Sequence, residues 1–318
     1  MSTNLDAAGV AVSLRRRRFT RRSVVRAVAP YTLIAPAIFV ILGILGYPFY
    51  DLVKLSFEQY GLFELIQHKG HWVGLHNFGV MLHDGVFWHT LERTIVFTIV
   101  NVSLTIVLGT LVALLLVRVA TVVRLMITTA LVLAWATPVV VAVQLWYWMT
   151  NFENGVANYV FTKLHFGNYI EHDWYATPMS ALGVTTTLIV WGAVPFVAIT
   201  VYAGLSQVPR DLVEAASVDG AGPLRTFRDV TYPVLKPILL VLTSLSIIWD
   251  FGVFTQPFLL LQSRPNPGYY LMSIYLFEKS IGLHEYGLGS AIAIVMVLIM
   301  LVLSFFYVRR MVRLGDVR

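Results

Sequence analysis

The stretch EAASVDGAGPLRTFRDVTYP, residues 214–233, is a polar interruption between two strongly apolar segments of the chain. Pro209, just before it, can open a helix, because a first-turn residue does not need its N–H. Gly220 can end that helix, because glycine adopts left-handed dihedral angles at little cost. Pro223 can start a second helix, PLRTFRDV. The sequence therefore predicts two short helices joined by a bend.

The first of these helices has a face without bulky side chains. Helical spacing places Leu212, Ala215 and Ala216 on one side, with Glu214 and Val218 nearly opposite. Two adjacent alanines allow another surface to approach closely. A solvated loop that merely connects its neighbours is the alternative that this local pattern leaves open.

The composition of the chain indicates a membrane protein. Of its 318 residues 58% are hydrophobic and 13% are charged, and the mean hydropathy is +0.74. Soluble domains carry about 25% charged residues. The absence of cysteine from the sequence excludes a disulfide framework and a cysteine-based metal site.

Six stretches are apolar and long enough to cross a bilayer, which takes about 20 residues. Because backbone groups in lipid must be hydrogen-bonded within their own segment, we expect helices and an all-α, polytopic fold. The expected spans are residues 30–50, 95–117, 124–148, 182–205, 235–254 and 288–308. The predicted organisation is a basic N-terminal tail at 1–29, a transmembrane domain at 30–308 with the polar loop at 206–236, and a C-terminal tail at 309–318.

Lys and Arg residues set the expected orientation, because they concentrate on the cytoplasmic side. Of the 23 such residues, 17 fall in the two tails and the loops on one side, and 6 on the other. Both termini and the polar loop are therefore expected in the cytoplasm, and the net charge of +6 marks topology and not nucleic-acid binding. The first apolar segment has no A-x-A-like cleavage site, so we interpret it as a retained span and not a signal peptide.

The polar loop resembles the EAA motif of ATP-binding-cassette (ABC) import permeases, which reads EAA---G---------I-x-L-P. Tyr232 stands where that family usually has Leu. The string E-A-A-x-x-D-G-A, which includes Asp219, is similar to the carbohydrate branch. The matching positions are Glu214, Ala215, Ala216, Gly220, Val230, Tyr232 and Pro233.

Other segments from Tyr47 to the C-terminus resemble the same branch. They are YPFYDLVKLSF with WVGLHNF, FWHTLERTIVFTIVNVSLTIVLGTLVALLL, TPVVVAVQLWYWMTNFENGVAN and YGLGSAIAIVM.

This resemblance implies the type I ABC importer permease fold, in a bacterial or archaeal cytoplasmic membrane. It also implies a second homologous permease subunit, two nucleotide-binding ATPase subunits and an extracytoplasmic solute-binding protein as partners. The loop would couple this chain to the ATPase. The coupling residues implied are Glu214, Ala215, Ala216, Asp219, Gly220 and Pro233.

The chain is not expected to be an enzyme. A Walker A loop requires G-x-x-x-x-G-K-[ST], and the sequence has no Gly-Lys pair. ATP and Mg²⁺ are therefore expected on the partner ATPase, with no cofactor on this chain.

Asp250 is a candidate for the substrate pathway, because ionisable groups inside a bilayer are costly and often functional. It lies roughly 20 Å beyond Pro237 along a helix, with Trp249 beside it and Phe254 expected one turn further on the same face. A carboxylate beside aromatic rings suits a saccharide. An Asp that pairs with another chain or reaches interfacial water is the alternative.

The family usually has an acid at the position of Thr255, and LLQSRPNPG replaces its L-T-G-G-G-P, so details of substrate recognition are not transferred. Gln144 and Trp191 are expected deeper in the membrane and complete the predicted pathway. Residues 146–148 are interpreted as interfacial aromatics, which gather near helix ends. Pro138 and Pro195 are expected to bend their helices.

Five histidines lie in the first outer loop, but their spacing fits no strict ligand pattern, so no metal site is expected. They are His68, His71, His76, His83 and His89.

The sequence thus predicts the permease subunit of an ATP-driven importer for a saccharide or related polyol. A permease for another small solute, such as a peptide or amino acid, is the alternative within the family. An ion-coupled secondary transporter is disfavoured, because the apolar spans hold no embedded Lys, Arg or His for a relay. A membrane-anchored interaction protein is disfavoured by the six spans.

Overall fold

The computed structural model describes residues 21–261 and 266–315. Most of the expected N-terminal tail, residues 1–20, and the last residues of the C-terminal tail, 316–318, lie outside this range. The chain divides into two units, Met1–Asp51 and Leu52–Arg318. Each is described by itself.

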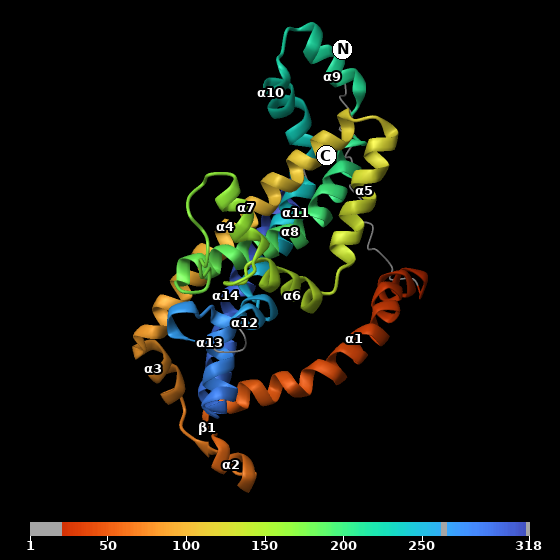
Figure 1. Cartoon of the computed structure of the whole chain (residues 1–318). Coiled ribbons are helices and arrows are strands. Elements are labelled where there is room, and N and C mark those ends of the chain that lie inside the picture. The colour runs from red at the N-terminus through yellow and green to blue at the C-terminus, as the bar shows by residue number, and fades with distance from the viewer. Residues whose placement is uncertain (1–20, 262–265, 316–318) are drawn as a thin grey trace, which may run out of the picture. The chain divides into compact units, whose positions relative to one another are not determined.

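The first unit consists, in its described part, of helix α1 (Arg21–Ser56), whose last residues belong to the second unit (Figure 1). Its apolar run, Tyr31–Ser56, is long enough to cross a membrane. The span predicted at 30–50 is therefore helical, and the helix continues beyond it at both ends.

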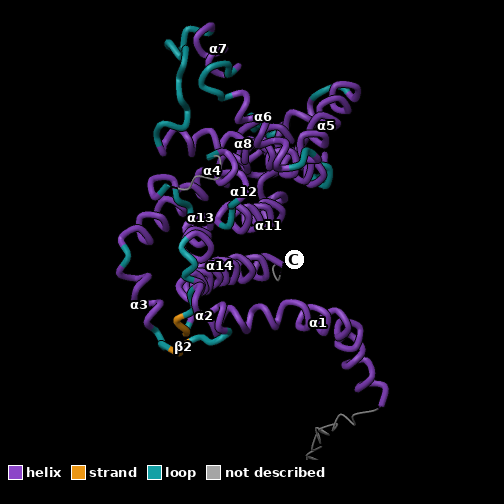
Figure 2. The backbone as a smooth tube through the Cα atoms, turned by 60° about the horizontal axis from the view of Figure 1, so that its bottom comes forward, coloured by secondary structure: helices purple, strands orange, loops and turns teal. Residues whose placement is uncertain are grey.

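The second unit contains four more helical segments that are long and apolar enough to cross a membrane. The segment Pro223–Phe251 comprises three helical elements, of which α11 is the longest. The long helices α4, α8, α11 and α14 are visible as continuous tubes in Figure 2. Their bounds are α4 (Gly85–Arg118), α8 (Pro178–Leu205), α11 (Tyr232–Phe251) and α14 (Tyr286–Gly315).

The predicted span at 124–148 is broken. Helix α5 (Thr121–Ala136) and helix α6 (Val139–Met149) meet at an angle of 100°. Pro138 is the N-cap of α6, and its ring and missing N–H prevent the helix from continuing. The expected bend at Pro138 is confirmed, although it is a break between two helices. Helix α8, in contrast, continues through Pro195.

Helix α8 lies against both α4 and α11, and glycines mark the closest approaches. A Cβ on Gly109 of α4 would lie 2.5 Å from Cγ1 of Val197. A Cβ on Gly204 of α8 would lie 2.5 Å from Cδ1 of Ile238 in α11. Small residues let membrane helices pack closely where no hydrophobic force drives them together. The two contacts fix the three helices near one end of the unit.

A buried polar stripe runs along α4. Thr94 donates through Oγ1 to the Thr90 carbonyl at 2.7 Å and accepts from the Met272 amide at 2.9 Å. Asn101 donates to the Phe97 carbonyl at 2.8 Å and to Oγ1 of Thr186 in α8 at 3.3 Å. These bonds join α4 to its neighbours without charge. The buried members of the stripe are Thr90, Thr94, Thr98, Asn101 and Thr105.

The connection before α4 holds short elements. Strand β1 (Glu58–Gln59) pairs antiparallel with strand β2 (His71–Trp72). Asn77 donates to the carbonyls of Ser56 and Glu58 at 3.0 and 2.8 Å, which fixes the start of this connection. It also contains α2 (Leu62–Gln67) and α3 (His76–His83).

The connections after α6 and α11 are also partly helical. The first holds α7 (Val156–Lys163). The second holds α12 (Thr255–Leu260), η2 (Pro267–Tyr269), α13 (Met272–Phe277) and η3 (Glu278–Gly282). Helix α13 is almost wholly buried, which ties this connection to the core.

Asp84 joins the start of α4 to α13 and η3. Its Oδ1 accepts from the Val86 amide at 2.8 Å and so caps α4. Its Oδ2 accepts from the Tyr275 hydroxyl at 2.7 Å and lies 3.3 Å from Nζ of Lys279. Partial burial raises the pKa of Asp84, but the hydrogen bonds and the nearby ammonium outweigh this and hold the pKa below its ordinary value.

We predict that Gly109→Ala destabilises the protein by about 1–3 kcal/mol, because the added methyl group overpacks the contact with Val197. The thermal midpoint of the detergent-purified protein measures the effect. The matched control is Gly192→Ala in α8, where nothing lies within 4 Å of the added Cβ. Equal midpoints for the two variants would contradict the close α4–α8 contact.

Candidate coupling loop and substrate site

The polar loop begins where α8 ends. Helix α9 (Arg210–Val218) follows Pro209, which is the N-cap, one residue earlier than its predicted place in the first turn. In Figure 1 the segment holding α9 and α10 (Pro223–Thr226) projects beyond one end of α8 and α11. We call residues 206–236 the coupling loop, after the role that the resemblance implies, and this end of the unit the loop end.

The bend after α9 is made by backbone groups alone. The Gly220 amide donates to the Ser217 carbonyl at 3.1 Å, and the Ala221 amide donates to the Ala216 carbonyl at 2.9 Å. Gly220 has a φ of 77°, in the left-handed region. This pair of hydrogen bonds and the left-handed residue form a Schellman motif. The predicted role of Gly220 as the residue that ends the helix is confirmed.

The second predicted helix is not a separate element. Pro223 does start α10, as predicted, but α10 passes directly into the π-helical turn η1 (Phe227–Thr231) and then into α11. Pro233 lies in the first turn of α11, where its missing N–H is tolerated. The Tyr232 amide donates to the Phe227 carbonyl, five residues back. One helical run therefore connects the loop to the membrane span.

The tip of the coupling loop carries exposed apolar side chains. Leu212 is 52%, Val218 87% and Leu224 81% exposed. Glu214 and Ala215 are exposed as well, whereas Ala216 is half-buried. The common face predicted for positions 212, 215 and 216 is therefore only partly free for a partner. The exposed residues at 218 and 224 were not predicted as contacts, although apolar residues in a polar segment were a signal.

A cavity of about 1320 Å³ lies between the coupling loop and the ends of α4, α5 and α8. Glu214 and Ser217 of α9 line it, together with Arg118, Arg124 and Tyr202. The Arg124 guanidinium donates to the Leu116 and Val119 carbonyls at 2.9 and 3.1 Å, and it lies 5.8 Å from the centre of the Tyr202 ring. Arg124 thus binds the carbonyls at the end of α4, and Glu214 lines a mostly apolar cavity that also contains Arg118.

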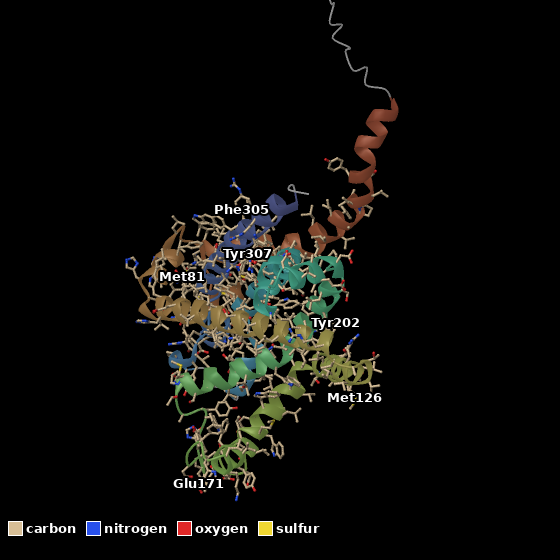
Figure 3. The ribbon with its side chains drawn as sticks, turned by 90° about the horizontal axis from the view of Figure 1, so that it is seen from above. Met81, Met126, Glu171, Tyr202, Phe305 and Tyr307 are labelled. Carbon is tan, nitrogen blue, oxygen red and sulfur yellow. The ribbon has the colours of Figure 1, made fainter. Side chains whose placement is uncertain are left out.

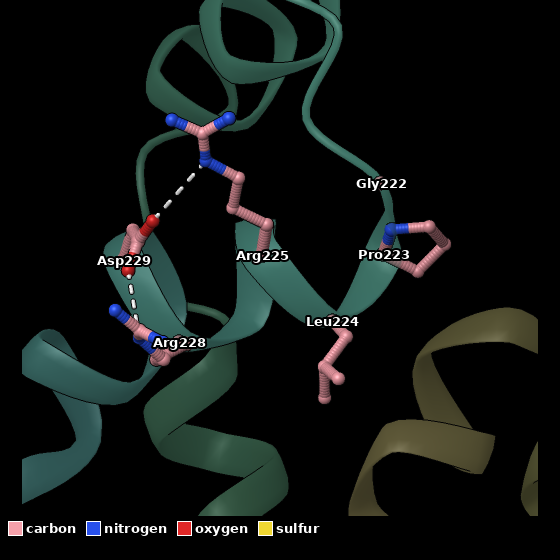
Figure 4. Close-up of a pocket in the computed structure, with 6 residues that line it drawn as sticks. All are labelled: Gly222, Pro223, Leu224, Arg225, Arg228 and Asp229. Carbon is pink, nitrogen blue, oxygen red and sulfur yellow. Dashed lines mark ion pairs between the residues drawn. The ribbon is translucent and has the colours of Figure 1, made fainter.

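A shallower pocket of about 500 Å³ lies on the α10 side of the loop (Figure 4). There Asp229 lies 3.6 Å from Nε of Arg225 and 3.2 Å from Nε of Arg228. All three side chains are largely exposed, and exposed pairs stabilise a fold by little. Their charges remain available to a partner surface.

Asp250 lies inside the helix bundle. It is 6% exposed and belongs to the last turn of α11, which ends at Phe251. The prediction that Phe254 follows one turn further on the same face is wrong, because Gly252 ends the helix and Phe254 is the N-cap of α12. Phe254 packs instead on Phe258 and Phe277, at ring distances of 4.7 and 5.2 Å.

Trp249, in contrast, is 54% exposed and extends an aromatic row between helices. Its ring centre lies 5.8 Å from that of Phe196, which stacks at 6.0 Å on Trp135 of α5. Phe196 and Trp135 were not predicted as site residues. They come from α5 and α8, so their alignment with Trp249 follows from the packing of separate helices, which a linear pattern does not specify.

The other two predicted pathway residues lie on α6 and α8. Gln144 is exposed, and Trp191 is half-buried. Trp191 packs on Trp146 at 4.8 Å, and Nε1 of Trp146 donates to Oγ1 of Thr187 at 3.1 Å. Trp146 therefore packs within the protein, while Trp148 is 59% exposed. Within residues 21–261 and 266–315, no hydrogen bond, ion pair or ring contact joins Gln144 or Trp191 to Asp250, so they form a separate region.

Among the described residues, no group of three His, Asp or Glu side chains is arranged to hold a metal ion.

The chain belongs to the family of binding-protein-dependent transport system inner membrane components, whose model matches residues 105–313. The match includes the coupling loop and every predicted site residue. This membership confirms the resemblance seen in the EAA motif.

Characterised relatives cover most of the chain. The diacetylchitobiose uptake system permease protein DasB of Streptomyces coelicolor is 40% identical over 89% of this chain and 86% of its own length. The sulfoquinovosyl glycerol transport system permease protein SmoG of Agrobacterium fabrum is 30% identical over 87% of this chain and 88% of its own. The trehalose/maltose transport system permease protein MalF of Thermococcus litoralis is 30% identical over 88% of this chain and 92% of its own length.

A solved structure shares the fold. A chain of a bacterial ABC transporter involved in the import of the acidic polysaccharide alginate superposes with a TM-score of 0.72 at 19% identity, over 92% of this chain and 98% of that chain. The fold is therefore that of a type I ABC importer permease, and the chain is a multi-pass membrane protein.

We predict that Gly220→Ala loosens the bend by about 1–2 kcal/mol, the cost of a left-handed residue with a Cβ. Nothing lies within 4 Å of the added Cβ, so the effect is one of backbone strain and not of a clash. Hydrogen exchange measured by mass spectrometry should rise in residues 216–222. Gly222→Ala is the matched control, because Gly222 has a φ of −69° and the same open surroundings. Unchanged exchange in Gly220→Ala would contradict the Schellman bend.

Proposed function

We propose that this chain is a permease subunit of an ATP-driven importer that moves a saccharide or related polyol across the cytoplasmic membrane. The observation that supports the substrate class most directly is the 40% identity to a permease named for diacetylchitobiose uptake. The carbohydrate names of the other relatives support it too.

We further propose that the coupling loop docks on a separate ATPase subunit, which carries ATP and Mg²⁺. Leu212, Val218 and Leu224 form the exposed apolar part of the contact, and unpartnered apolar groups of this kind mark interaction sites. Glu214, with Ala215, Ala216 and Asp219 around it, supplies the polar part. A carboxylate forms charge-assisted hydrogen bonds, which are stronger than neutral ones.

The continuous helical run Pro223–Phe251 supports mechanical coupling in this proposal. At 1.5 Å per residue it is about 43 Å long. A movement of the loop would therefore be carried toward the level of Asp250 along one helical run, which includes the π-helical turn η1 and Pro237. Closure of the ATPase pair would then bias a two-state equilibrium of the pathway, as alternating access requires.

In this proposal the termini and the coupling loop face the cytoplasm, since 17 of the 23 Lys and Arg residues lie on that side. A second, homologous permease subunit completes the pathway, with two ATPase subunits below. A solute-binding protein docks on the outer connections, including those that hold α7 and α13.

Reconstitution in vesicles tests this function. We expect uptake of a labelled oligosaccharide only when ATP, the ATPase subunits and the binding protein are all present. Glu214→Lys should lower uptake and stimulated ATP hydrolysis about 10-fold or more, because a hydrogen bond to a charged group contributes about 1.5–3 kcal/mol. Glu92→Lys, which reverses an exposed charge in α4 outside the coupling loop and the outer connections, is the control for charge alone.

Undiminished uptake without the ATPase subunits would refute the importer assignment. Uptake of a labelled dipeptide or amino acid, with none of the oligosaccharide, would refute the substrate class and leave the coupling role intact. Normal coupling in Glu214→Lys would remove that residue from the docking contact.

We also predict that Asp250→Ala raises the KM for uptake about 10-fold with the complex still assembled. Because Asp250 is 6% exposed, contact with a solute requires the helices around α11 to rearrange during transport. Ser246→Ala, one turn earlier and also buried, is the matched control. Loss of assembly in Asp250→Ala would indicate a structural pairing instead, and unchanged kinetics would exclude the residue from the pathway.

A further inference from the structure

A third pocket at the loop end lies between α11 and α14, and it includes Tyr232 and Lys236 at the end of the coupling loop. It has a volume of about 870 Å³. On α11 its wall follows one helical face, which includes Tyr232, Lys236 and Leu240. On α14 it includes Tyr307 and the pair Arg309 and Arg310. The pocket therefore joins the foot of one membrane span to the end of another.

The charged part of this pocket is wholly cationic. Lys236, Arg309 and Arg310 line it, and no Asp or Glu does. Within residues 21–261 and 266–315, none of these three cations lies within ion-pair distance of a carboxylate. By contrast, Arg225 and Arg228 of the same loop end both pair with Asp229. Three cations that converge without a counter-ion favour an anionic ligand.

Apart from Thr243 and two tyrosines, the rest of the pocket is apolar and continues onto the outer surface of α14. Leu239 and Leu240 line it from α11, and Phe306 lines it from α14. Further along α14, Leu301 is 59% and Phe305 59% exposed. Figure 3 shows Phe305 and Tyr307 on this part of the helix. A ligand with a charged head can therefore extend a hydrocarbon chain along the same wall.

The pocket wall also holds two tyrosines, with Tyr232 one turn before Lys236 on α11 and Tyr307 between Phe306 and Arg309 on α14. Tyr232 is 42% exposed, and both it and Tyr307 line the pocket. Aromatic residues with a polar tip are enriched at the level of lipid headgroups. Basic pockets between transmembrane helices bind anionic headgroups.

We propose that this pocket binds an anionic phospholipid. Its phosphate is held by Lys236, Arg309 and Arg310, and one acyl chain lies against Leu240 and the outer face of α14. Free phosphate shares the headgroup chemistry, but it would leave the apolar wall unused. The bound lipid would hold the end of α14 to the foot of α11, next to the coupling loop.

Native mass spectrometry of the detergent-purified transporter tests this proposal. The complex is mixed with equal amounts of dioleoylphosphatidylglycerol and dioleoylphosphatidylcholine, and the retained lipids are counted. We expect preferential retention of phosphatidylglycerol, which falls several-fold in the double variant Arg309→Gln/Arg310→Gln. Lys69→Gln/Lys163→Gln, which removes the same charge from the connections that hold α2 and α7, should retain as much as the parent.

Two further variants separate lipid binding from loss of fold. Arg309→Lys/Arg310→Lys keeps the charge and should keep the lipid. Leu240→Trp fills the apolar wall without changing the charge and should lower retention. If the double glutamine variant fails to assemble, lipid retention in these two variants decides whether the pocket binds phosphatidylglycerol.

Equal retention of phosphatidylglycerol in the parent and the double glutamine variant would overturn the proposal. Displacement of the lipid by 10 mM inorganic phosphate would identify a free-phosphate site instead and would also overturn it. Release of a partner subunit with lipid retention unchanged would show that the pocket is a protein contact, and the lipid proposal would then be wrong.

Discussion

The second unit depends on close backbone contact between α8 and its two neighbours. Gly109 meets Val197, and Gly204 meets Ile238, at distances that leave no room for a side chain on either glycine. In a bilayer, apolar side chains gain little free energy by moving from lipid into a helix contact. Close packing at small residues and buried hydrogen bonds therefore hold the helices together. Gly204 is the last helical residue but one before the coupling loop. The crossing of α8 with α11 therefore fixes both ends of the loop at its root.

The two ends of the coupling loop connect to their membrane helices in different ways. On one side, α10, η1 and α11 form an uninterrupted run from Pro223 to Phe251. On the other side, a short segment with Ser206 and Pro209 separates α8 from α9. A displacement of the tip would therefore be transmitted more directly to α11 than to α8. In the proposed function, this asymmetry makes α11 the element that reports the state of the ATPase to the membrane.

Much of the fold could be predicted from the sequence, because hydropathy and backbone hydrogen bonding restrict long apolar segments to helices. The motif residues Gly220 and Pro223 also act as predicted, since their roles depend on local dihedral angles. The predictions that failed concern residues whose structure depends on packing against other helices or on adjacent turns. The run through Pro233 includes a π-helical turn, and Phe254 lies outside α11 because that helix ends at Phe251, within the span expected at 235–254. The burial of Asp250 comes from packing that no linear pattern specifies.

The shape of the bend at Gly220 does not depend on the exposed side chains around it. It is closed by the carbonyls of Ala216 and Ser217 and by the amides of Gly220 and Ala221, so no side chain at the tip is needed to maintain it. In the proposed function, substitutions at Leu212, Val218 or Leu224 can therefore alter which ATPase subunit is bound while the path of the backbone stays the same. During evolution, one ATPase subunit could then be exchanged for another by changes in these few side chains, with the helical run of α10, η1 and α11 unchanged.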